Sequence, residues 1–207
     1  IILFSKNEIA KVNKKYNKKI YLIGESVHSI KKIHKPSSKS YKILFIGNLG
    51  YIPNILACKE FVKNILPRLN QIMPEIKFCI IGDISKKNKI LLSRNKNVEI
   101  IGSKKNIIKF AQNSFCGLAN LSIATGIQVK VLKYMSYGLP VICSNLVASN
   151  FDKNVLNYKS NKDLIKKIIF LKNRKIVWDT FSKKSHFFVK KYKWNKVQNQ
   201  YLKIINL

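Results

Sequence analysis

The segment TGIQVKVLKYM, which begins at Thr125, carries residue types suited to binding an anion. Gly126 stands where an amphipathic helical pattern begins, and Lys130 and Lys133 follow on one face of the expected helix. Backbone amides at a helix N-terminus attract phosphate, and nearby ammonium groups add to that attraction. In so lysine-rich a chain the two lysines also fit a solvated helix face, so both interpretations stay open.

Three further segments place glycine directly after an apolar run of strand length: GNLGYIPN, GDISKK and GSKKN. Gly47 and Asn48 open the first segment, and Gly102 and Ser103 open the last. Small residues let backbone amides approach a phosphate, but the same glycines serve any tight strand-to-helix turn. Asn48 can cap such a turn as readily as it can contact a ligand. The loops are compatible with a phosphate ligand without requiring one.

No side-chain relay for acid–base or nucleophilic catalysis is evident. The three histidines are isolated, no serine lies in a GxSxG turn, and neither Asp83 nor Asp152 has a neighbouring carboxylate. We therefore name no catalytic residue. Any reaction would depend on binding and positioning, or on a base from elsewhere in a longer protein.

Strands and helices alternate through the middle of the chain, and this order must position the loops. YKILFIG, KFCIIGD, NVEIIG, SFCGLANL and LPVICS have the continuous apolar character of strands covered on both faces. PNILACKEFVKNILPRLNQIM, KKNIIKFAQN and GIQVKVLKYMSYG have helical periodicity, with a kink or break expected at Pro67. The pattern predicts an α/β fold, a Rossmann-like doubly wound parallel sheet with a helical tail from about Asn161.

The strong positive charge sets limits on partners and location. The chain has 207 residues, with 40 Lys and Arg against 9 Asp and Glu, for a formal net charge of +31. Such a field attracts nucleic acid, anionic lipid or acidic glycan. The lysines are spread along the chain, whereas nucleic-acid sites favour arginine in one stripe, so compositional bias explains them better and nucleic acid is not a favoured partner. No apolar run approaches 18 residues and IILF is no signal peptide, so we expect a cytoplasmic location, with peripheral contact to the anionic inner face of the cell membrane left open.

The four cysteines do not suggest a metal site. Cys58, Cys79, Cys116 and Cys143 lie far apart, without a CxxC motif or a histidine at ligand spacing. Three of them stand in or beside apolar runs, which predicts buried free thiols in a reducing compartment.

The segment from ILFIGNLG to FCIIG, followed by that from NVEIIG to VICS, resembles the nucleotide-sugar-binding half of GT-B glycosyltransferases. It is most similar to retaining enzymes of family 4, glycosyl transferases group 1, which carry GIQNKVLEAMAxGxPVV. The leading FSKNEIAKVNKKYNKKIYLIGESVHS resembles the end of the family's acceptor-binding domain and its linker. The resemblance implies a chain truncated at its N-terminus, with residues 1–40 as this remnant, residues 41–190 as the donor-nucleotide-binding domain and residues 191–207 as a C-terminal helix.

By resemblance, several residues acquire roles. The diphosphate of the donor would lie on the backbone amides of residues 126–128, Gly47 and Asn48 would approach the phosphates and the transferring sugar, and Gly102 and Ser103 would face the base. The resemblance implies the following donor-binding residues: Gly47, Asn48, Gly102, Ser103, Thr125, Gly126, Ile127, Gln128, Lys130 and Lys133. The family implies a donor such as a UDP- or GDP-sugar, a glycan or lipid-linked acceptor in envelope polysaccharide synthesis, and no cofactor or metal.

One departure from the family divides the functional hypotheses. The paired glutamates of the family map onto Thr125 and Lys133, and the second of them normally binds the ribose hydroxyls. A lysine donates hydrogen bonds but cannot accept one, and losing a charged acceptor costs about 1.5–3 kcal/mol. Lys133 could instead pair with a phosphate. The chain is therefore either a working donor domain or a degenerate, non-catalytic module that binds anionic lipid, glycan or a partner subunit through its basic surface.

Overall fold

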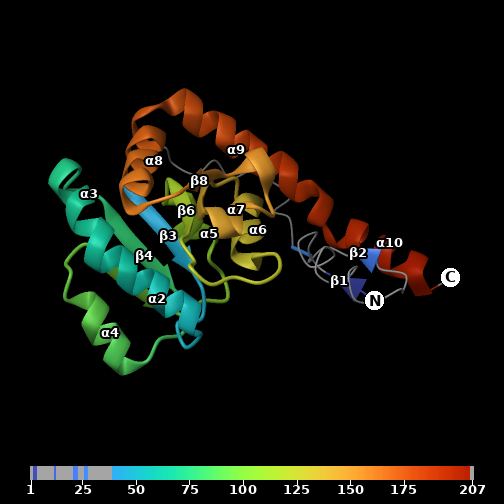
Figure 1. Cartoon of the computed structure of the whole chain (residues 1–207), viewed down its shortest axis with the longest axis horizontal. Helices are drawn as coiled ribbons and strands as arrows, with labels where there is room; N and C mark the ends of the chain where they lie inside the picture. Colours follow the sequence, from blue (N-terminus) through green and yellow to red (C-terminus); the bar gives the residue numbers. More distant parts are fainter. Residues whose placement is uncertain (1, 4–11, 13–20, 23–25, 28–38, 206–207) are drawn as a thin grey trace.

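The computed structural model describes residues 2–3, 12, 21–22, 26–27 and 39–205. Most of the predicted acceptor-domain remnant and linker, residues 1–40, lies outside these described residues, and the proposed domain division stays a prediction. The centre of the molecule is a six-stranded sheet in which every pair of neighbours is parallel (Figure 1). Its strands are β3 (Lys42–Ile46), β4 (Lys77–Ile81), β5 (Val98–Gly102), β6 (Cys116–Ala119), β7 (Val141–Ser144) and β8 (Leu156–Tyr158). A short parallel pair, β1 (Ile2–Leu3) with β2 (Tyr21–Leu22), is separate from it.

The strand order is β5-β4-β3-β6-β7-β8, so the chain winds outward from β3 in one direction and outward from β6 in the other. The reversal between β3 and β6 makes a topological switch point, and ligands of doubly wound sheets bind beyond the carboxyl ends of the strands there. The Rossmann-like doubly wound fold predicted from the sequence is confirmed.

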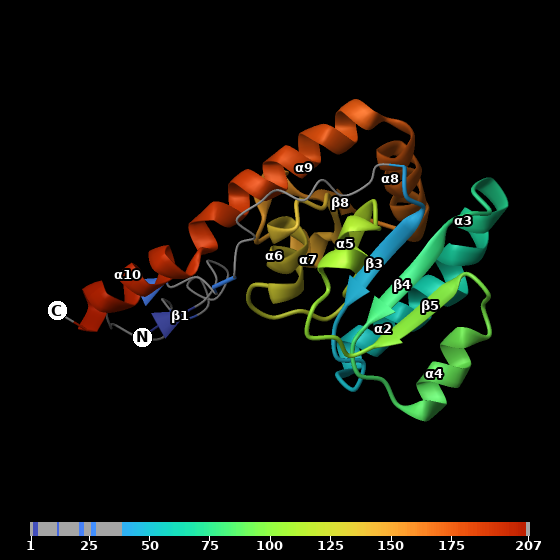
Figure 2. The same ribbon diagram turned by 180° about the vertical axis from the view of Figure 1, so that it is seen from behind.

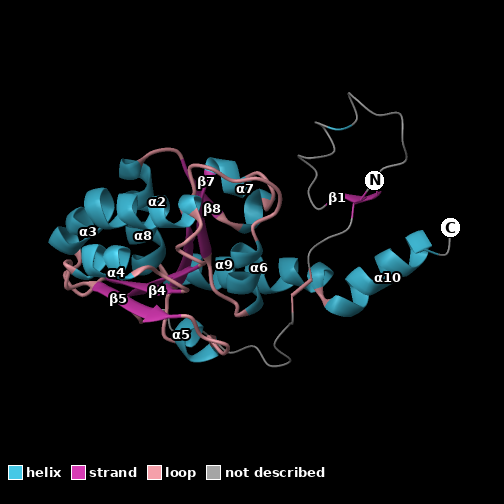
Figure 3. Cartoon of the chain, turned by 90° about the horizontal axis from the view of Figure 1, so that it is seen from below, coloured by secondary structure: helices cyan, strands magenta, loops and turns pink. Residues whose placement is uncertain are grey.

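Helices cover both faces of the sheet (Figures 1 and 2). One face carries α2 (Ile52–Glu60), the π-helical turn η1 (Phe61–Ile65), α3 (Leu66–Ile72), α4 (Lys86–Ser93) and α8 (Asn161–Asn173). The other carries α5 (Ile108–Gln112) and α6 (Val129–Ser136), with α9 (Lys175–Val189) packed on α6. The short helices α7 (Asn145–Ala148) and η2 (Asp152–Asn154) precede β8. The turn η3 (Lys190–Tyr192) leads to α10 (Trp194–Ile205), which projects away from the sheet (Figure 3).

The predicted elements agree with the structure except where they are short or begin in a loop. All five expected strands are present, and the expected break near Pro67 is the π-helical turn that precedes α3. The helical tail begins at Asn161 as expected. The sequence pattern did not predict α4 or the three-residue strand β8. It also placed the start of α5 too early, because the side chain of Asn106 accepts a hydrogen bond from the amide of Ile108 and so ends the preceding turn there.

The hydrophobic core is formed by buried side chains of the strands and of the helices that cover both faces of the sheet. Fully buried aromatic side chains from β3, η1 and β4 pack together, with the rings of Phe61 and Phe78 4.4 Å apart at their centroids. All four cysteines are buried and free, as predicted.

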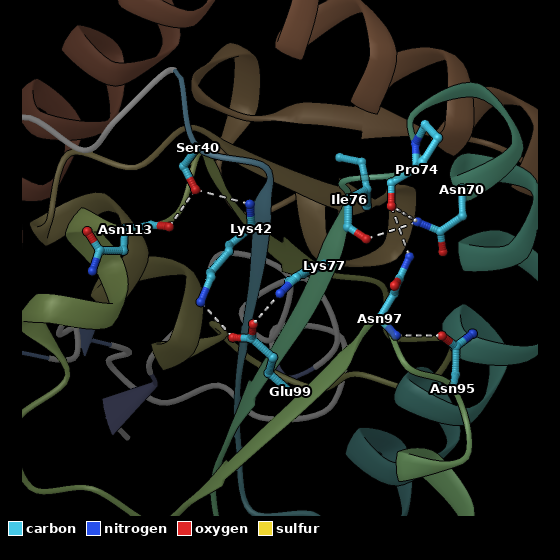
Figure 4. Close-up of polar contacts among 10 residues, drawn as sticks. All are labelled: Ser40, Lys42, Asn70, Pro74, Ile76, Lys77, Asn95, Asn97, Glu99 and Asn113. Carbon is cyan, nitrogen blue, oxygen red and sulfur yellow. Dashed lines mark hydrogen bonds and ion pairs between the residues drawn. The ribbon is translucent and has the colours of Figure 1, made fainter.

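The amino-terminal end of the sheet is held by polar contacts (Figure 4). Lys42 and Lys77 are register neighbours on β3 and β4. The carboxylate of Glu99, on β5, pairs with both: one oxygen is 2.7 Å from the Nζ of Lys42 and the other is 3.4 Å from the Nζ of Lys77. The amide of Asn70, on α3, donates to the carbonyl of Ile76 at the start of β4. The glycine-containing loops lie at the opposite, carboxyl-terminal end of the sheet.

Candidate functional site

The loops that follow β3, β4 and β5 are hydrogen-bonded to one another. The amide of Gly47 donates to the carbonyl of Ile81 and the amide of Gly82 donates to the carbonyl of Gly102, both at 3.0 Å, and the amide of Leu49 donates to the carbonyl of Asp83 at 2.7 Å. Gly82 has a φ of +151°, and a Cβ atom there would lie 1.8 Å from the carbonyl oxygen of Gly47. Only glycine fits, so residue 82 allows the three strand ends to approach.

The switch point between β3 and β6 is filled by α6. The two strands pair at Ile43–Cys116 and Leu44–Gly117 and then diverge. Beyond that point the hydroxyl of Tyr134 accepts a hydrogen bond from the amide of Ile46 (2.7 Å) and donates to the carbonyl of Leu118 (3.2 Å). Tyr134 is fully buried, and this burial raises the pKa of its phenol well above the usual value, so the hydroxyl stays neutral. A tyrosine thus replaces the missing backbone pairing.

A cavity of about 440 Å³ opens at this end of the sheet. Its lining comes from the loops after β3, β4 and β5, from the later part of α6, and from the segment before the sheet. The lining residues are Ser26, Val27, Ile46, Gly47, Asn48, Ile81, Gly82, Asp83, Ser103, Lys104, Lys105, Ile107, Lys133, Ser136 and Tyr137.

Three lysines and one carboxylate give the cavity its charge. Lys104, Lys105 and Lys133 are exposed members of the lining, and Asp83 is the single acidic one. The excess of ammonium groups favours an anionic ligand. Val27, a buried residue of the lining, donates from its amide to the carbonyl of Tyr192 at 2.9 Å, so the C-terminal turn η3 holds this residue in place.

The structure brings some of the predicted donor-binding residues together and separates others. Gly47, Asn48, Ser103 and Lys133 line the cavity, and Gly102 is directly beside it through its carbonyl contact with Gly82. The predicted residues that lie outside the lining are Gly102, Thr125, Gly126, Ile127, Gln128 and Lys130.

The start of α6 corrects one expectation. The helix was expected to begin at residues 126–128, but it begins at Val129, with Gln128 as its extended N-cap residue. The cause is the turn at Gly126, which has a φ of +60°, in the left-handed region, and whose carbonyl accepts a hydrogen bond from Asn150 at 3.1 Å. The side chain of Gln128 also donates to the carbonyl of Thr125 (3.1 Å), which closes a turn. The amides of Gly126 and Ile127 therefore belong to a loop that precedes the helix.

Lys130 and Lys133 have different surroundings although they are three residues apart. Lys133 is exposed and faces the cavity. Lys130 is only partly exposed; its ammonium group contacts the side-chain oxygen of Asn54 and lies 4.2 Å from the centroid of the Phe45 ring. The solvated helix face that remained possible from the sequence is therefore wrong for Lys130.

Several lining residues were not predicted individually. Gly82, Asp83, Lys104 and Lys105 belong to the GDISKK and GSKKN loops, whose position after apolar strands was the available signal. Asn54 and Tyr134 are not part of the lining, and no signal in the sequence marked them. The reason is that their hydrogen-bond partners, Lys130 and Ile46, are 76 and 88 residues away in the chain.

No group of His, Cys, Asp or Glu among the described residues could hold a metal ion. In the same described part of the chain, no helix is long and apolar enough to cross a membrane.

The fold and the site together define an α/β, Rossmann-like domain of the GT-B type. A family model described as "Glycosyl transferases group 1" matches residues 40–173, and the chain belongs to this family. No curated protein matches the sequence.

Solved structures have the same fold at low sequence identity. A variant of S. aureus TarM in complex with fondaparinux, alpha-GlcNAc-glycerol and UDP is 18% identical, with a TM-score of 0.77 over 100% of this chain and 43% of that chain. The pneumococcal O-GlcNAc transferase GtfA in complex with UDP and GlcNAc is 12% identical, with a TM-score of 0.77 over 99% of this chain and 44% of that chain. Anabaena Alr3699/HepE in complex with UDP and glucose is 10% identical, with a TM-score of 0.79 over 99% of this chain and 62% of that chain. This chain therefore spans about half the length of the proteins that it resembles.

Proposed function

We propose that this chain is the donor-binding part of a retaining glycosyltransferase that transfers a sugar from a nucleotide-sugar to a glycan or lipid-linked acceptor. The observation that carries the proposal is the cavity at the carboxyl ends of β3, β4 and β5, where Gly47, Asn48, Ser103 and Lys133 meet. Family membership and the UDP complexes of TarM, GtfA and HepE support a nucleotide-sugar as the ligand. The cavity presents the ammonium groups of Lys104, Lys105 and Lys133 to a diphosphate, and we assign no protein base to the transfer.

The place of this reaction is also a proposal. We place it in cell-envelope polysaccharide synthesis in the cytoplasm, with peripheral contact of the basic surface to the inner face of an anionic membrane. Support comes from the formal charge of +31, which attracts anionic lipid, and from the glycan-related ligands in the TarM and GtfA complexes.

Calorimetric titration tests the donor site. UDP-glucose, UDP-GlcNAc and GDP-mannose are titrated into the full chain, into Ser103→Trp and into Ser93→Trp. Ser103 is an exposed residue of the cavity lining, so an indole there blocks the cavity, whereas Ser93 is exposed at the end of α4 and serves as the matched control. We expect binding of at least one donor by the native chain and by the Ser93 variant, and its loss in the Ser103 variant. Failure of every nucleotide to bind the native chain removes the proposal.

A second candidate function is a non-catalytic binding module, and the position of Lys133 favours it. The exposed Lys133 lines the cavity at the position where family members have a ribose-binding glutamate. Lys133→Glu separates the two functions. For a working donor site in which Lys133 contacts a phosphate, the substitution weakens nucleotide binding about tenfold or more. Stronger nucleotide binding by the variant would instead show that the native site has degenerated.

A further inference from the structure

The ammonium group of Lys130 occupies the switch point directly beneath the loop that follows β3. It donates to the side-chain oxygen of Asn54 and lies 4.2 Å from the centroid of the Phe45 ring. A Cβ atom built on Gly47 would be 3.2 Å from this nitrogen. Lys130 precedes Tyr134 by one helical turn, so the two side chains together fill the gap between β3 and β6.

No carboxylate balances this charge among the described residues. The ion pairs found there are Lys42–Glu99, Lys77–Glu99 and Lys175–Asp179. The titratable neighbours of Lys130 are the thiols of Cys58, on α2, and Cys143, on β7, with the phenol of Tyr134 on its own helix. Burial raises the pKa of both thiols, so they stay neutral. Burial lowers the pKa of Lys130 to about 8, because a largely buried ammonium without a counter-charge is costly.

Asn54 connects Lys130 to the cavity. The amide nitrogen of Asn54 donates to the backbone carbonyl of Asn48 at 2.8 Å, and Asn54 is only 6% exposed. The two contacts fix the orientation of the Asn54 amide, since an ammonium can only donate and a carbonyl can only accept. The side chain of Asn48 in turn accepts a hydrogen bond from the amide of Gly50 at 2.7 Å. The loop that lines the cavity is therefore held by α6, from the other half of the sheet.

We propose that Lys130 is a positioning residue for an anionic ligand: through Asn54 it fixes the loop at Gly47 and Asn48, and its ammonium provides the counter-charge for a diphosphate bound over that loop. This inference rests on the proposed nucleotide-sugar site and assigns a role within it. Lys130 is absent from the cavity lining, so it acts through the loop and not by direct contact.

Hydrogen exchange tests the loop connection without any ligand. Amide exchange is measured at residues 47–50 in the native chain, in Lys130→Met and in Lys166→Met, which removes an exposed lysine on α8. We expect at least about tenfold faster exchange of these amides in Lys130→Met alone. Equal exchange in all three proteins overturns the proposed connection, whatever the result of nucleotide titration.

Proton linkage tests the counter-charge. UDP, or GDP if the native chain does not bind UDP, is titrated at pH 8 in two buffers that differ in ionisation enthalpy, so that the proton uptake on binding is measured. An anion over Gly47 favours the protonated amine, and with a pKa of about 8 the native chain should take up as much as about half a proton. Lys130→Arg keeps a permanent charge, and is expected to bind UDP without proton uptake, whereas Lys130→Met is expected to bind at least about tenfold more weakly.

The outcomes separate the two proposals. Binding of UDP by the native chain without proton uptake, or with the same uptake in Lys130→Arg, overturns the role of Lys130 and leaves the nucleotide site intact. Failure of both UDP and GDP to bind the native chain removes the counter-charge and the proposed donor site together, and the hydrogen-exchange result still decides on the loop connection.

Discussion

The ring of Tyr134 lies directly over Gly117, so close that a Cβ atom on Gly117 would be 2.4 Å from the ring. Gly117 is the last residue of β6 that pairs with β3, and the hydroxyl of Tyr134 then joins the two strands where they separate. The divergence that creates a ligand crevice in doubly wound sheets is thus stabilised here by one buried phenol. The loop at Gly47 follows immediately, so the geometry of the cavity depends on this contact.

Tyr134→Phe is expected to lower the free energy of unfolding by about 1–3 kcal/mol, because it leaves the partly buried amide of Ile46 and the buried carbonyl of Leu118 without their hydrogen-bond partner. Urea denaturation followed by circular dichroism measures the change. Tyr51→Phe is the matched control, since Tyr51 is 57% exposed, and should change stability by less than about 0.5 kcal/mol. Equal effects in the two variants would contradict a structural role for the Tyr134 hydroxyl.

Gly82→Ala is expected to destabilise the chain by about 1–3 kcal/mol and to weaken nucleotide binding. A methyl group at residue 82 meets the carbonyl of Gly47, and its φ of +151° disfavours a side chain. Asp83→Ala is the stability control, because Asp83 is exposed and its backbone contact with Leu49 is kept. Thermal unfolding of both variants measures the difference, and a Gly82 variant as stable as the Asp83 variant would show that the three strand ends can separate without cost.

The sheet was predictable from the sequence because its central strands carry continuous apolar runs, such as YKILFIG and KFCIIGD, whose burial on both faces leaves one plausible architecture. Strand β8 was not predictable, because it has three residues, only one of which is buried, and so lacks an apolar run. The π-helical turn before α3 was signalled by Pro67, which cannot donate a helical hydrogen bond.

The site was predictable at the level of loops but less so at the level of residues. Glycine after an apolar strand marked the loops that meet at the cavity, including that at Gly47. The start of α6 could not be read from its periodicity, because the turn at Gly126 depends on Asn150, 24 residues away in the chain. The burial of Lys130 depends likewise on Asn54, on another helix, and only the folded chain places them together.

The four thiols are expected to react slowly in the native chain. Burial raises the pKa of Cys79 to about 11 and raises those of Cys58, Cys116 and Cys143 further above the usual value, so little thiolate forms at pH 8. Reaction with a chromogenic disulfide reagent should therefore be slow in buffer, and should reach all four cysteines at once in denaturant. A thiol that reacts in the native chain as fast as free cysteine would contradict the burial of its side chain.

The pH dependence of stability should reveal the buried ammonium of Lys130. Its pKa is about 8 in the folded chain, because burial lowers it, and about 10.4 in the unfolded chain. Between these values the unfolded state binds more protons than the folded state, so the contribution of Lys130 to the free energy of unfolding rises with pH. Below pH 8 the folded chain bears the full cost of the buried charge.

The native chain should therefore gain stability relative to Lys130→Met as the pH rises from 7 to 9.5, because methionine keeps the apolar stem and has no charge to lose. Urea denaturation at several pH values measures this difference, in which groups common to both proteins cancel. Lys166→Met, which removes an exposed lysine, controls for the loss of one positive charge. For each variant, the difference in free energy of unfolding from the native chain is followed with pH. If this difference changes with pH by the same amount for the Lys130 and Lys166 variants, the ammonium of Lys130 does not behave as a buried, uncompensated charge. Its proposed role at the loop then loses its electrostatic basis.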